Sequence, residues 1–229
     1  MSALGEHLGA SGSATSANSF YRLQPQVLRR VLCALDEAIK ETVALLGGIR
    51  RLEPQFTRQL AACFEASRDR AGGALYHIDH QGELPIRNGE GRVIFYRRLD
   101  IRLLFTKQVG RRGDYLCIEC KYLDATDRGS DREYVEEGVD RIVTGEYALG
   151  HRVAIMIGLE RIGPLSRTIA NVHDRLTRRY GEDQGLRPAP RWKLCTAAES
   201  EHPQAGGPHR ITIVHGFWPI TATARPTTC

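Results

Sequence analysis

The sequence predicts an α/β protein in which a mixed central sheet is flanked by helices. Segments with apolar residues at helical spacing alternate with short apolar or β-branched runs, and glycines and prolines separate them. The predicted order is two helices, three strands, a helix, a strand, a helix and two strands. From the second helix to Leu159 this order is αβββαβ.

The composition is that of an ordinary globular chain with a slight excess of basic residues. Lys and Arg number 32 against 27 Asp and Glu, a net charge of +5 that mildly favours a polyanionic partner. No apolar run is long enough to cross a bilayer, and the N-terminus lacks the features of a secretory signal. We therefore expect a cytoplasmic protein without a membrane partner.

Three regions are expected along the chain. Residues 1–19 are rich in Ala, Gly and Ser and should be disordered. Residues 20–218 should form a single domain, and residues 219–229 a flexible tail.

Two helices are expected before the first strand. The first runs over 25–46, and the second follows Pro54 and ends before Gly72. Each is followed by a Gly-Gly pair, which commonly ends a helix.

Three strands are expected at 74–78, 92–105 and 115–122, with a polar loop at 80–91. Side chains alternate between the two faces of a strand, so the long middle strand has an apolar and a charged face. The apolar face comprises Leu99, Ile101, Leu103 and Phe105. The charged face comprises Arg98, Asp100 and Arg102.

Two charged residues stand at the end of the third strand. Residues 115–122 read YLCIECKY, in which Glu119 and Lys121 project from the same side. Charges on such an apolar strand are costly unless they are paired or bind something. If the second and third strands form a hairpin, Asp100 lies beside both.

Asp100 and the triplet Glu119-Cys120-Lys121 resemble the motif of the PD-(D/E)XK nuclease superfamily, which has the restriction-endonuclease-like fold. Leu99 stands where the motif has proline, a residue that carries no ligand atom. The αβββαβ order is also the core topology of this family, so the resemblance covers about residues 55–160. The first helix, the last helix and the last two strands lie outside that core.

The resemblance implies a metal-dependent nuclease that hydrolyses phosphodiester bonds of DNA. Asp100 and Glu119 would hold Mg²⁺, or Mn²⁺ as a substitute, and the backbone carbonyl of Cys120 would add a ligand. Lys121 would activate or orient the attacking water. The family often adds a glutamate from the first core helix, for which Glu65 is a better candidate than Glu53, because Glu53 precedes Pro54.

The rest of the chain supplies further candidates. Residues 124–131 should form a mobile loop, 133–148 a helix, 152–159 a strand buried on both faces and 164–180 a basic helix. Residues 181–190 should be a linker, with final strands at 191–196 and 209–217. Candidate DNA contacts are Arg98, Arg102, Arg111, Arg112 and Arg141. Solvation or packing is the alternative role for Arg141, as for Tyr134 and Glu137 on the same helix.

Competing interpretations remain open at this stage. Glu119 and Lys121 could be a structural ion pair, with Asp100 bonded to Arg98 or Arg102. Cys117 and Cys120 have the spacing of a zinc knuckle, but on a strand their sulfurs point to opposite faces. His77 and His80 fail as a metal pair for the same reason.

The segment 134–147 (YVEEGVDRIVTGEY), with a buried strand after it and a late strand that contains His215, is similar to small nuclease-like proteins of bacterial anti-phage systems. His215 itself is more typical of a hydrogen-bonded strand histidine than of a catalyst. The alternative function is a catalytically silent nuclease-like subunit that binds nucleic acid or serves as a scaffold in a defence complex. A hydrolase of small phosphoesters is a third possibility. Expected partners are DNA, a second copy of the chain, and a separate ATPase or other defence subunit.

Overall fold

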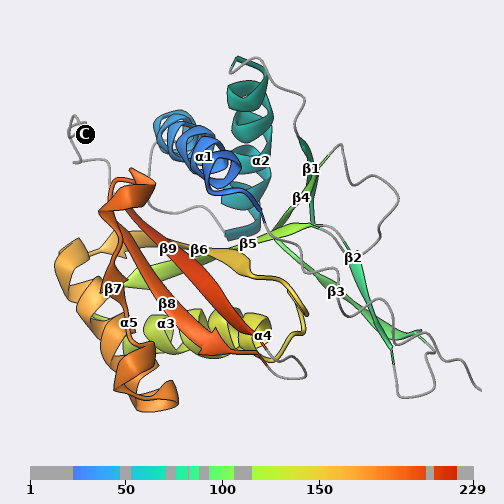
Figure 1. Ribbon diagram of the computed structural model, residues 1–229. Helices are drawn as coiled ribbons and strands as arrows, with labels where there is room; N and C mark the ends of the chain where they lie inside the picture. Colours follow the sequence, from blue (N-terminus) through green and yellow to red (C-terminus); the bar gives the residue numbers. More distant parts are fainter. Residues whose placement is uncertain are drawn as a thin grey trace, which may run out of the picture.

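A mixed seven-stranded sheet runs through the centre of the computed structural model (Figure 1). The structure describes residues 23–46, 53–70, 76–81, 83–87, 93–105, 115–204 and 209–220. The strands are β1 (Tyr76–His80), β2 (Glu83–Arg87), β3 (Val93–Arg98), β4 (Ile101–Phe105), β5 (Leu116–Asp124), β6 (Val153–Ile162), β7 (Arg187–Pro188), β8 (Ala197–Pro203) and β9 (Arg210–Pro219). The sheet order is β1-β4-β5-β6-β9-β8-β7, in which β5, β6 and β9 are parallel and the remaining neighbours are antiparallel. The predicted α/β class with a mixed sheet is confirmed.

Helices cover both faces of this sheet (Figure 1). They are α1 (Pro25–Leu46), α2 (Glu53–Arg70), α3 (Arg128–Arg132), the π-helix η2 (Glu133–Val139), α4 (Asp140–Val143), α5 (Leu165–Tyr180), and the 3₁₀ turns η3 (Glu182–Gln184) and η4 (Pro190–Trp192). One buried apolar cluster joins α1 and α2 to the sheet, and a second lies under η2, α4 and α5. The first two helices lie where the apolar periodicity predicts them.

The single strand expected at 92–105 is wrong, because the chain leaves one sheet and enters another. Within the described residues, β3 pairs only with β2, in a separate two-stranded ribbon, whereas β4 belongs to the central sheet. The break falls at Leu99 and Asp100. Leu99 is therefore buried in the cluster under η2, while Ile101 is buried in the cluster under α1 and α2. A one-residue shift in alternation moves a side chain to the other face.

Residues 124–131 form a hydrogen-bonded turn in place of the expected loop. The carboxylate of Asp124 accepts a hydrogen bond from the amide of Thr126 at 2.8 Å, and Asp127 caps α3 by accepting from the amide of Gly129 at 2.8 Å. The helix expected at 133–148 thus begins earlier, at residue 128. Its central part winds as a π-helix. This form is rare overall, but where it occurs it is often near a functional site.

The segment before β8 also differs from expectation. The linker expected at 181–190 contains η3 and the short strand β7, and the strand expected at 191–196 is replaced by η4 and an irregular segment. Lys193 has a left-handed φ of 53°, so the chain turns there before β8 begins at Ala197. The missing period-2 apolar pattern at 197–203 explains why this strand was not predicted.

A buried hydrogen-bonded chain ties η2 to β9 and β8. Tyr134 Oη lies 2.9 Å from His215 Nδ1, and Ser200 Oγ lies 2.8 Å from both His215 Nε2 and His202 Nε2. His202 Nδ1 lies 3.2 Å from Gln184 Oε1. His215 is therefore the hydrogen-bonded strand histidine that the sequence indicates.

The hydrogen bonds that link Tyr134 to Gln184 through these side chains all run in one direction. The side-chain amide of Gln184 donates to a backbone carbonyl, so its Oε1 must accept from His202. Burial lowers the pKa of His202 to about 4 and that of His215 to about 3, so both rings are neutral at pH 7 and each has one donor and one acceptor. Ser200 then donates to His202, His215 donates to Ser200, and Tyr134 donates to His215.

Candidate functional site

The β4–β5 hairpin brings Asp100 to the motif triplet, as predicted. The two strands are antiparallel, with Ile101 opposite Ile118. Asp100 lies just before β4, and its Oδ2 accepts a hydrogen bond from the backbone amide of Cys120 at 2.8 Å. The carboxylate thus continues the hydrogen bonding of the hairpin beyond the last strand pair. This contact fixes Asp100 beside residues 119–121.

Glu119 and Lys121 share one face of β5, also as predicted. Lys121 Nζ lies 3.2 Å from Glu119 Oε1, and both side chains are buried. Gly138 of η2 makes room for Met156, since an added Cβ would lie 2.4 Å from Met156 Cε, and it lies next to the lysine stem, 3.9 Å from Lys121 Cγ. The helix backbone therefore packs closely over this part of the strand.

Glu53, and not Glu65, is the glutamate that α2 contributes. Glu53 begins α2, and its Oε1 lies 3.3 Å from Lys121 Nζ while its Oε2 accepts from the amide of Tyr122 at 3.3 Å. Glu65 lies about 18 Å further along the helix axis, at about 1.5 Å per residue. The structure thus brings Glu53, and not the preferred candidate Glu65, to Lys121, because Glu53 stands at the end of α2 that lies against Lys121 and Tyr122.

Burial controls the protonation of the two motif carboxyls. Burial, and for Glu119 also the charge of Asp100, raises the pKa of Asp100 to about 6 and that of Glu119 to about 8. The pKa of Lys121 is raised above its ordinary value. Burial alone would lower this pKa, but the nearby carboxylates of Glu119, Glu53 and Asp100 raise it by more, so the ammonium stays charged. Glu119 Oε2 is buried and has no hydrogen-bond partner within the described residues. A buried, unpaired carboxylate oxygen is costly unless a ligand completes it.

These residues fit a hard divalent cation of the Mg²⁺ type. No cluster of three His, Cys, Asp or Glu side chains with metal-binding geometry occurs in the described part of the chain. Mg²⁺, however, is commonly held by one or two carboxylates together with waters and substrate phosphate. Asp100 and Glu119 supply two such carboxylates, and the unpartnered oxygen of Glu119 is the position that a cation would complete.

The arginines that were candidate DNA contacts differ in the groups that they contact. Arg102 pairs with Asp79 on β1, so it is not the partner of Asp100. Arg141 acts on Asp100, since its positive charge lowers the pKa of that carboxyl against the effect of burial. The backbone carbonyl of Arg98 accepts a hydrogen bond from the hydroxyl of Tyr147. Arg111 and Arg112 lie outside the described residues.

Tyr147 is a site residue that the sequence did not identify. Its hydroxyl is 2.9 Å from Arg141 Nη1 and 3.2 Å from the carbonyl of Arg98, and its side chain is buried. The only sequence signal was its place at the end of the helix predicted for 133–148. The turns that follow α4, which bring it back under Arg141, were not predictable from periodicity.

Cys117 and Cys120 project from opposite faces of β5. They are buried in different apolar clusters, on opposite faces of the sheet. The predicted separation of the two sulfurs is confirmed. Burial raises the pKa of both thiols well above the usual value, so they behave as core residues.

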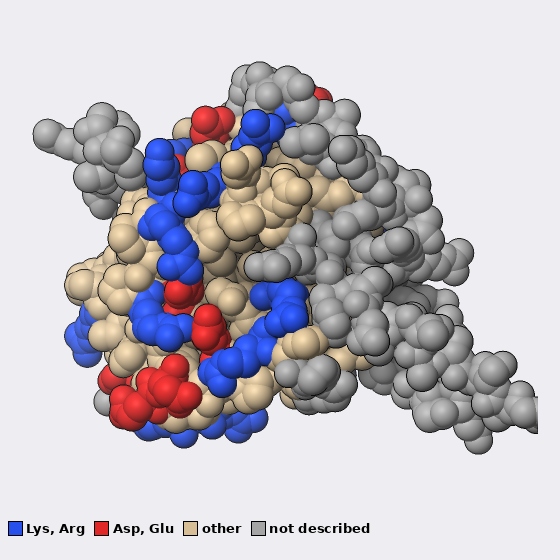
Figure 2. All heavy atoms as spheres, viewed as in Figure 1, with Lys and Arg blue, Asp and Glu red and all other residues tan. Residues whose placement is uncertain are grey.

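Much of the basic surface is engaged in ion pairs. On the face shown in Figure 2, several Lys and Arg groups lie next to Asp and Glu groups. The ion pairs of the described residues include Arg179 with Asp140 at 2.6 Å and Arg210 with Glu201 at 3.9 Å. Net charge alone therefore does not locate a polyanion on this face.

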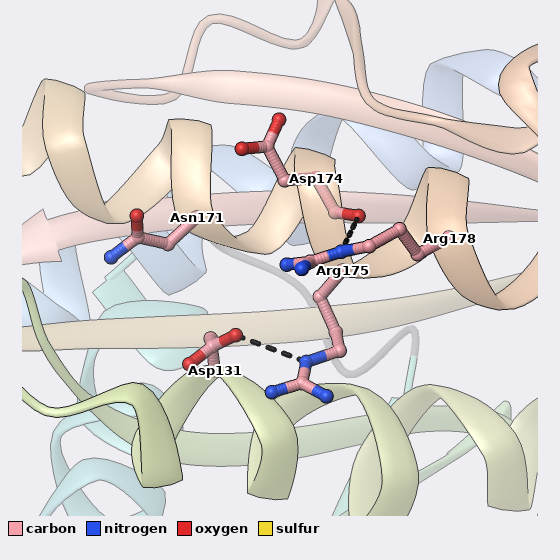
Figure 3. Close-up of a pocket in the computed structure, with 5 residues that line it drawn as sticks. All are labelled: Asp131, Asn171, Asp174, Arg175 and Arg178. Carbon is pink, nitrogen blue, oxygen red and sulfur yellow. Dashed lines mark hydrogen bonds and ion pairs between the residues drawn. The ribbon is translucent and has the colours of Figure 1, made fainter.

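A pocket of about 180 Å³ lies between α3 and α5 (Figure 3). It is lined by Asp131, Asn171, Asp174, Arg175 and Arg178. Arg175 Nε lies 3.1 Å from Asp131 Oδ2, so an ion pair joins the two helices at this point. The lining includes two acids and two arginines and shares no residue with the carboxylate cluster on β5.

No protein-family model matches the chain, and no curated protein or solved structure shows significant similarity to it. None of the helices in the described ranges combines the length and the apolar character of a bilayer-spanning segment.

Proposed function

We propose that this protein is a divalent-metal-dependent nuclease that hydrolyses phosphodiester bonds of DNA. The observation that carries the proposal is the buried Glu119, whose Oε2 has no hydrogen-bond partner in the described residues, beside Asp100 and Lys121. The order α2, β1, β4, β5, α3–α4, β6, with the β2–β3 ribbon inserted, supports a restriction-endonuclease-like core.

The residues have distinct roles in this proposal. Asp100 and Glu119 would hold Mg²⁺ or Mn²⁺, with the carbonyl of Cys120 as a further ligand. When bound, the cation would neutralise charge on the phosphate and lower the pKa of a water. Lys121 would orient the attacking water or stabilise charge that develops on the phosphate. Glu53 is the second carboxylate that contacts the lysine ammonium, at 3.3 Å beside Glu119 at 3.2 Å.

Neutral isosteric variants test this function. Asp100→Asn and Glu119→Gln should each lower cleavage of supercoiled plasmid by about two or more orders of magnitude, because each removes a metal ligand. The fold should survive, since amides keep the side-chain volume. Asp140→Asn is the matched control, because Asp140 pairs with Arg179 away from the cluster. Near-normal cleavage by either ligand variant, with Mg²⁺ or Mn²⁺, would refute the assignment.

A second function has its own support in the lysine contacts. Lys121 is engaged with two carboxylates, the arrangement expected of a structural ion pair. A silent nuclease-like subunit of an anti-phage complex would bind DNA without cutting it. Wild-type protein that binds DNA but cleaves none with either metal would favour this alternative. A cytoplasmic location, a homodimer and a separate ATPase partner belong to the same proposal.

A further inference from the structure

The hydroxyl of Tyr147 connects an arginine to the strand that leads into Asp100. A carbonyl can only accept, so the hydroxyl donates to Arg98 O at 3.2 Å and accepts from Arg141 Nη1 at 2.9 Å. The tyrosine is itself fixed, because its own carbonyl accepts a hydrogen bond from the hydroxyl of Tyr115 and its side chain is 2% exposed. Arg98 is two residues before Asp100, across the β3–β4 break.

Arg141 is held firmly but retains hydrogen-bonding capacity. Its guanidinium carbon lies 5.6 Å from the centre of the Tyr147 ring, and its Nε lies 3.7 Å from Glu146 Oε1. Nη2 makes no hydrogen bond to any residue that the structure describes, and the side chain is 30% exposed. A guanidinium presents five N–H donors in a planar fork, which matches a phosphate in a bidentate manner.

Arg141 is the cation of this site that is best placed to meet an anion. Lys121 lies between Glu119 and Glu53, at 3.2 and 3.3 Å. Arg141 pairs with Glu146 through Nε only, at 3.7 Å, and its charge acts on Asp100. A divalent metal would balance the two positive and four negative side chains of this set, so the open N–H groups of the guanidinium, and not an excess of positive charge, favour a phosphate.

We propose that Arg141 binds a backbone phosphate of the substrate at the rim of the carboxylate cluster, and that Tyr147 is the positioning residue that holds it there. The inference rests on the proposed function for its substrate. Its binding test does not require cleavage, however.

The binding test uses a fluorescent DNA duplex in EDTA and in Ca²⁺, with the salt concentration varied. Arg141→Gln should reduce the slope of log affinity against log salt by about 0.9, the value for one lost phosphate contact. Arg141→Lys and Tyr147→Phe keep the charge and should retain the wild-type slope. An unchanged slope in Arg141→Gln overturns the phosphate assignment.

The kinetic test separates position from charge. Tyr147→Phe and Arg141→Lys should lower kcat about tenfold or more with little change in KM, because misplacement of a charge acts on the transition state. Tyr180→Phe is the matched control, since it also removes a tyrosine hydroxyl that donates a hydrogen bond, to Asp140, but it does not contact Arg141. It should show a similar loss of melting temperature with wild-type kcat. Wild-type kcat in Tyr147→Phe, or an equal fall in both tyrosine variants, overturns the positioning role.

The two proposals fail separately. If wild-type protein does not cleave DNA, the proposed function fails and the salt slope still decides the role of Arg141. If wild-type protein cleaves and the Arg141 and Tyr147 variants behave as wild type, the further inference fails and the proposed function stands.

Discussion

At the scale of single residues, Lys121 is the best example of a side chain with two possible roles. Its ammonium lies between Glu119 and Glu53, at 3.2 and 3.3 Å. These contacts stabilise a charge in a buried position, where an unpaired ammonium would be costly. The same contacts place a fixed positive charge next to Asp100, where phosphate charge would develop.

Replacement of Lys121 by Met separates these roles. The variant should bind Mg²⁺ at least as well as the wild type, because a competing positive charge is removed from the carboxylates. Cleavage should nevertheless fall by about two orders of magnitude if the lysine acts on water or phosphate. Calorimetry, melting temperature and cleavage rate on one preparation decide the matter. A stable variant that binds metal and cleaves normally would exclude a catalytic lysine.

Glu53 and Glu65 offer a comparison on one helix. Glu53→Gln should lower cleavage about tenfold or more, because Lys121 loses one of its two hydrogen-bonded carboxylates and with it a fixed position. Glu65→Gln should behave as the wild type, since Glu65 is about 18 Å away along α2. Plasmid cleavage by the two variants, measured side by side, checks this. Equal losses in both would mean that Glu65 has a role which its position does not explain.

At the scale of elements, periodicity predicted the regular segments and failed at the junctions. α1 was predictable because its apolar residues recur at helical spacing and a Gly-Gly pair follows it. The β3–β4 break was not, because residues 92–105 read as one alternating strand and only the pairing with different partners separates them. The π-helix could not be predicted either, because its apolar residues have the spacing that is also expected of an α-helix.

The buried histidines give one element-scale prediction about pH. The folded pKa values of His202 and His215 lie below the ordinary value of 6.5, so the unfolded chain binds more protons as the pH falls below 6.5. The free energy of unfolding should therefore fall with decreasing pH, by at most about 1.4 kcal/mol per pH unit for each histidine. His215→Gln should show a shallower slope between pH 6.5 and 4.5 in urea denaturation. An identical slope would mean that His215 is protonated in the folded protein.

At the scale of the whole molecule, the site draws on segments that are distant in the sequence. The pair of Asp100 with residues 119–121 was predictable, because a hairpin is a local structure. The contribution of Glu53 was not, since it is 68 positions from Lys121 and depends on how α2 lies across the sheet. Tyr147 and Arg141 join the site only because η2 and α4 fold back over β5 and the β3–β4 junction.

The carboxyl pair predicts how metal binding depends on pH. The pKa of Asp100 is raised from 3.8 to about 6 and that of Glu119 from 4.5 to about 8. These two carboxyls stabilise the metal-free fold below about pH 4, and this contribution is lost as the pH rises through 6 and 8. Because a cation must displace their protons, Mg²⁺ affinity should rise from pH 6 to pH 8. Calorimetry in wild type and Glu119→Gln checks this, and a flat profile in the wild type would refute it.

The parallel pairing of β6 with β9 has a consequence for the order in which the molecule forms. Ile155 pairs with Val214, so this contact must wait for the closure of a long loop that contains α5 and β8. Long-range contacts of this kind form late in folding, because the entropy of closure comes first. β9 carries His215, which holds Tyr134 and with it the π-helix over Lys121. In refolding experiments, helical signal from α1 should therefore precede the ability to bind metal, so that the site is among the last parts of the protein to be completed.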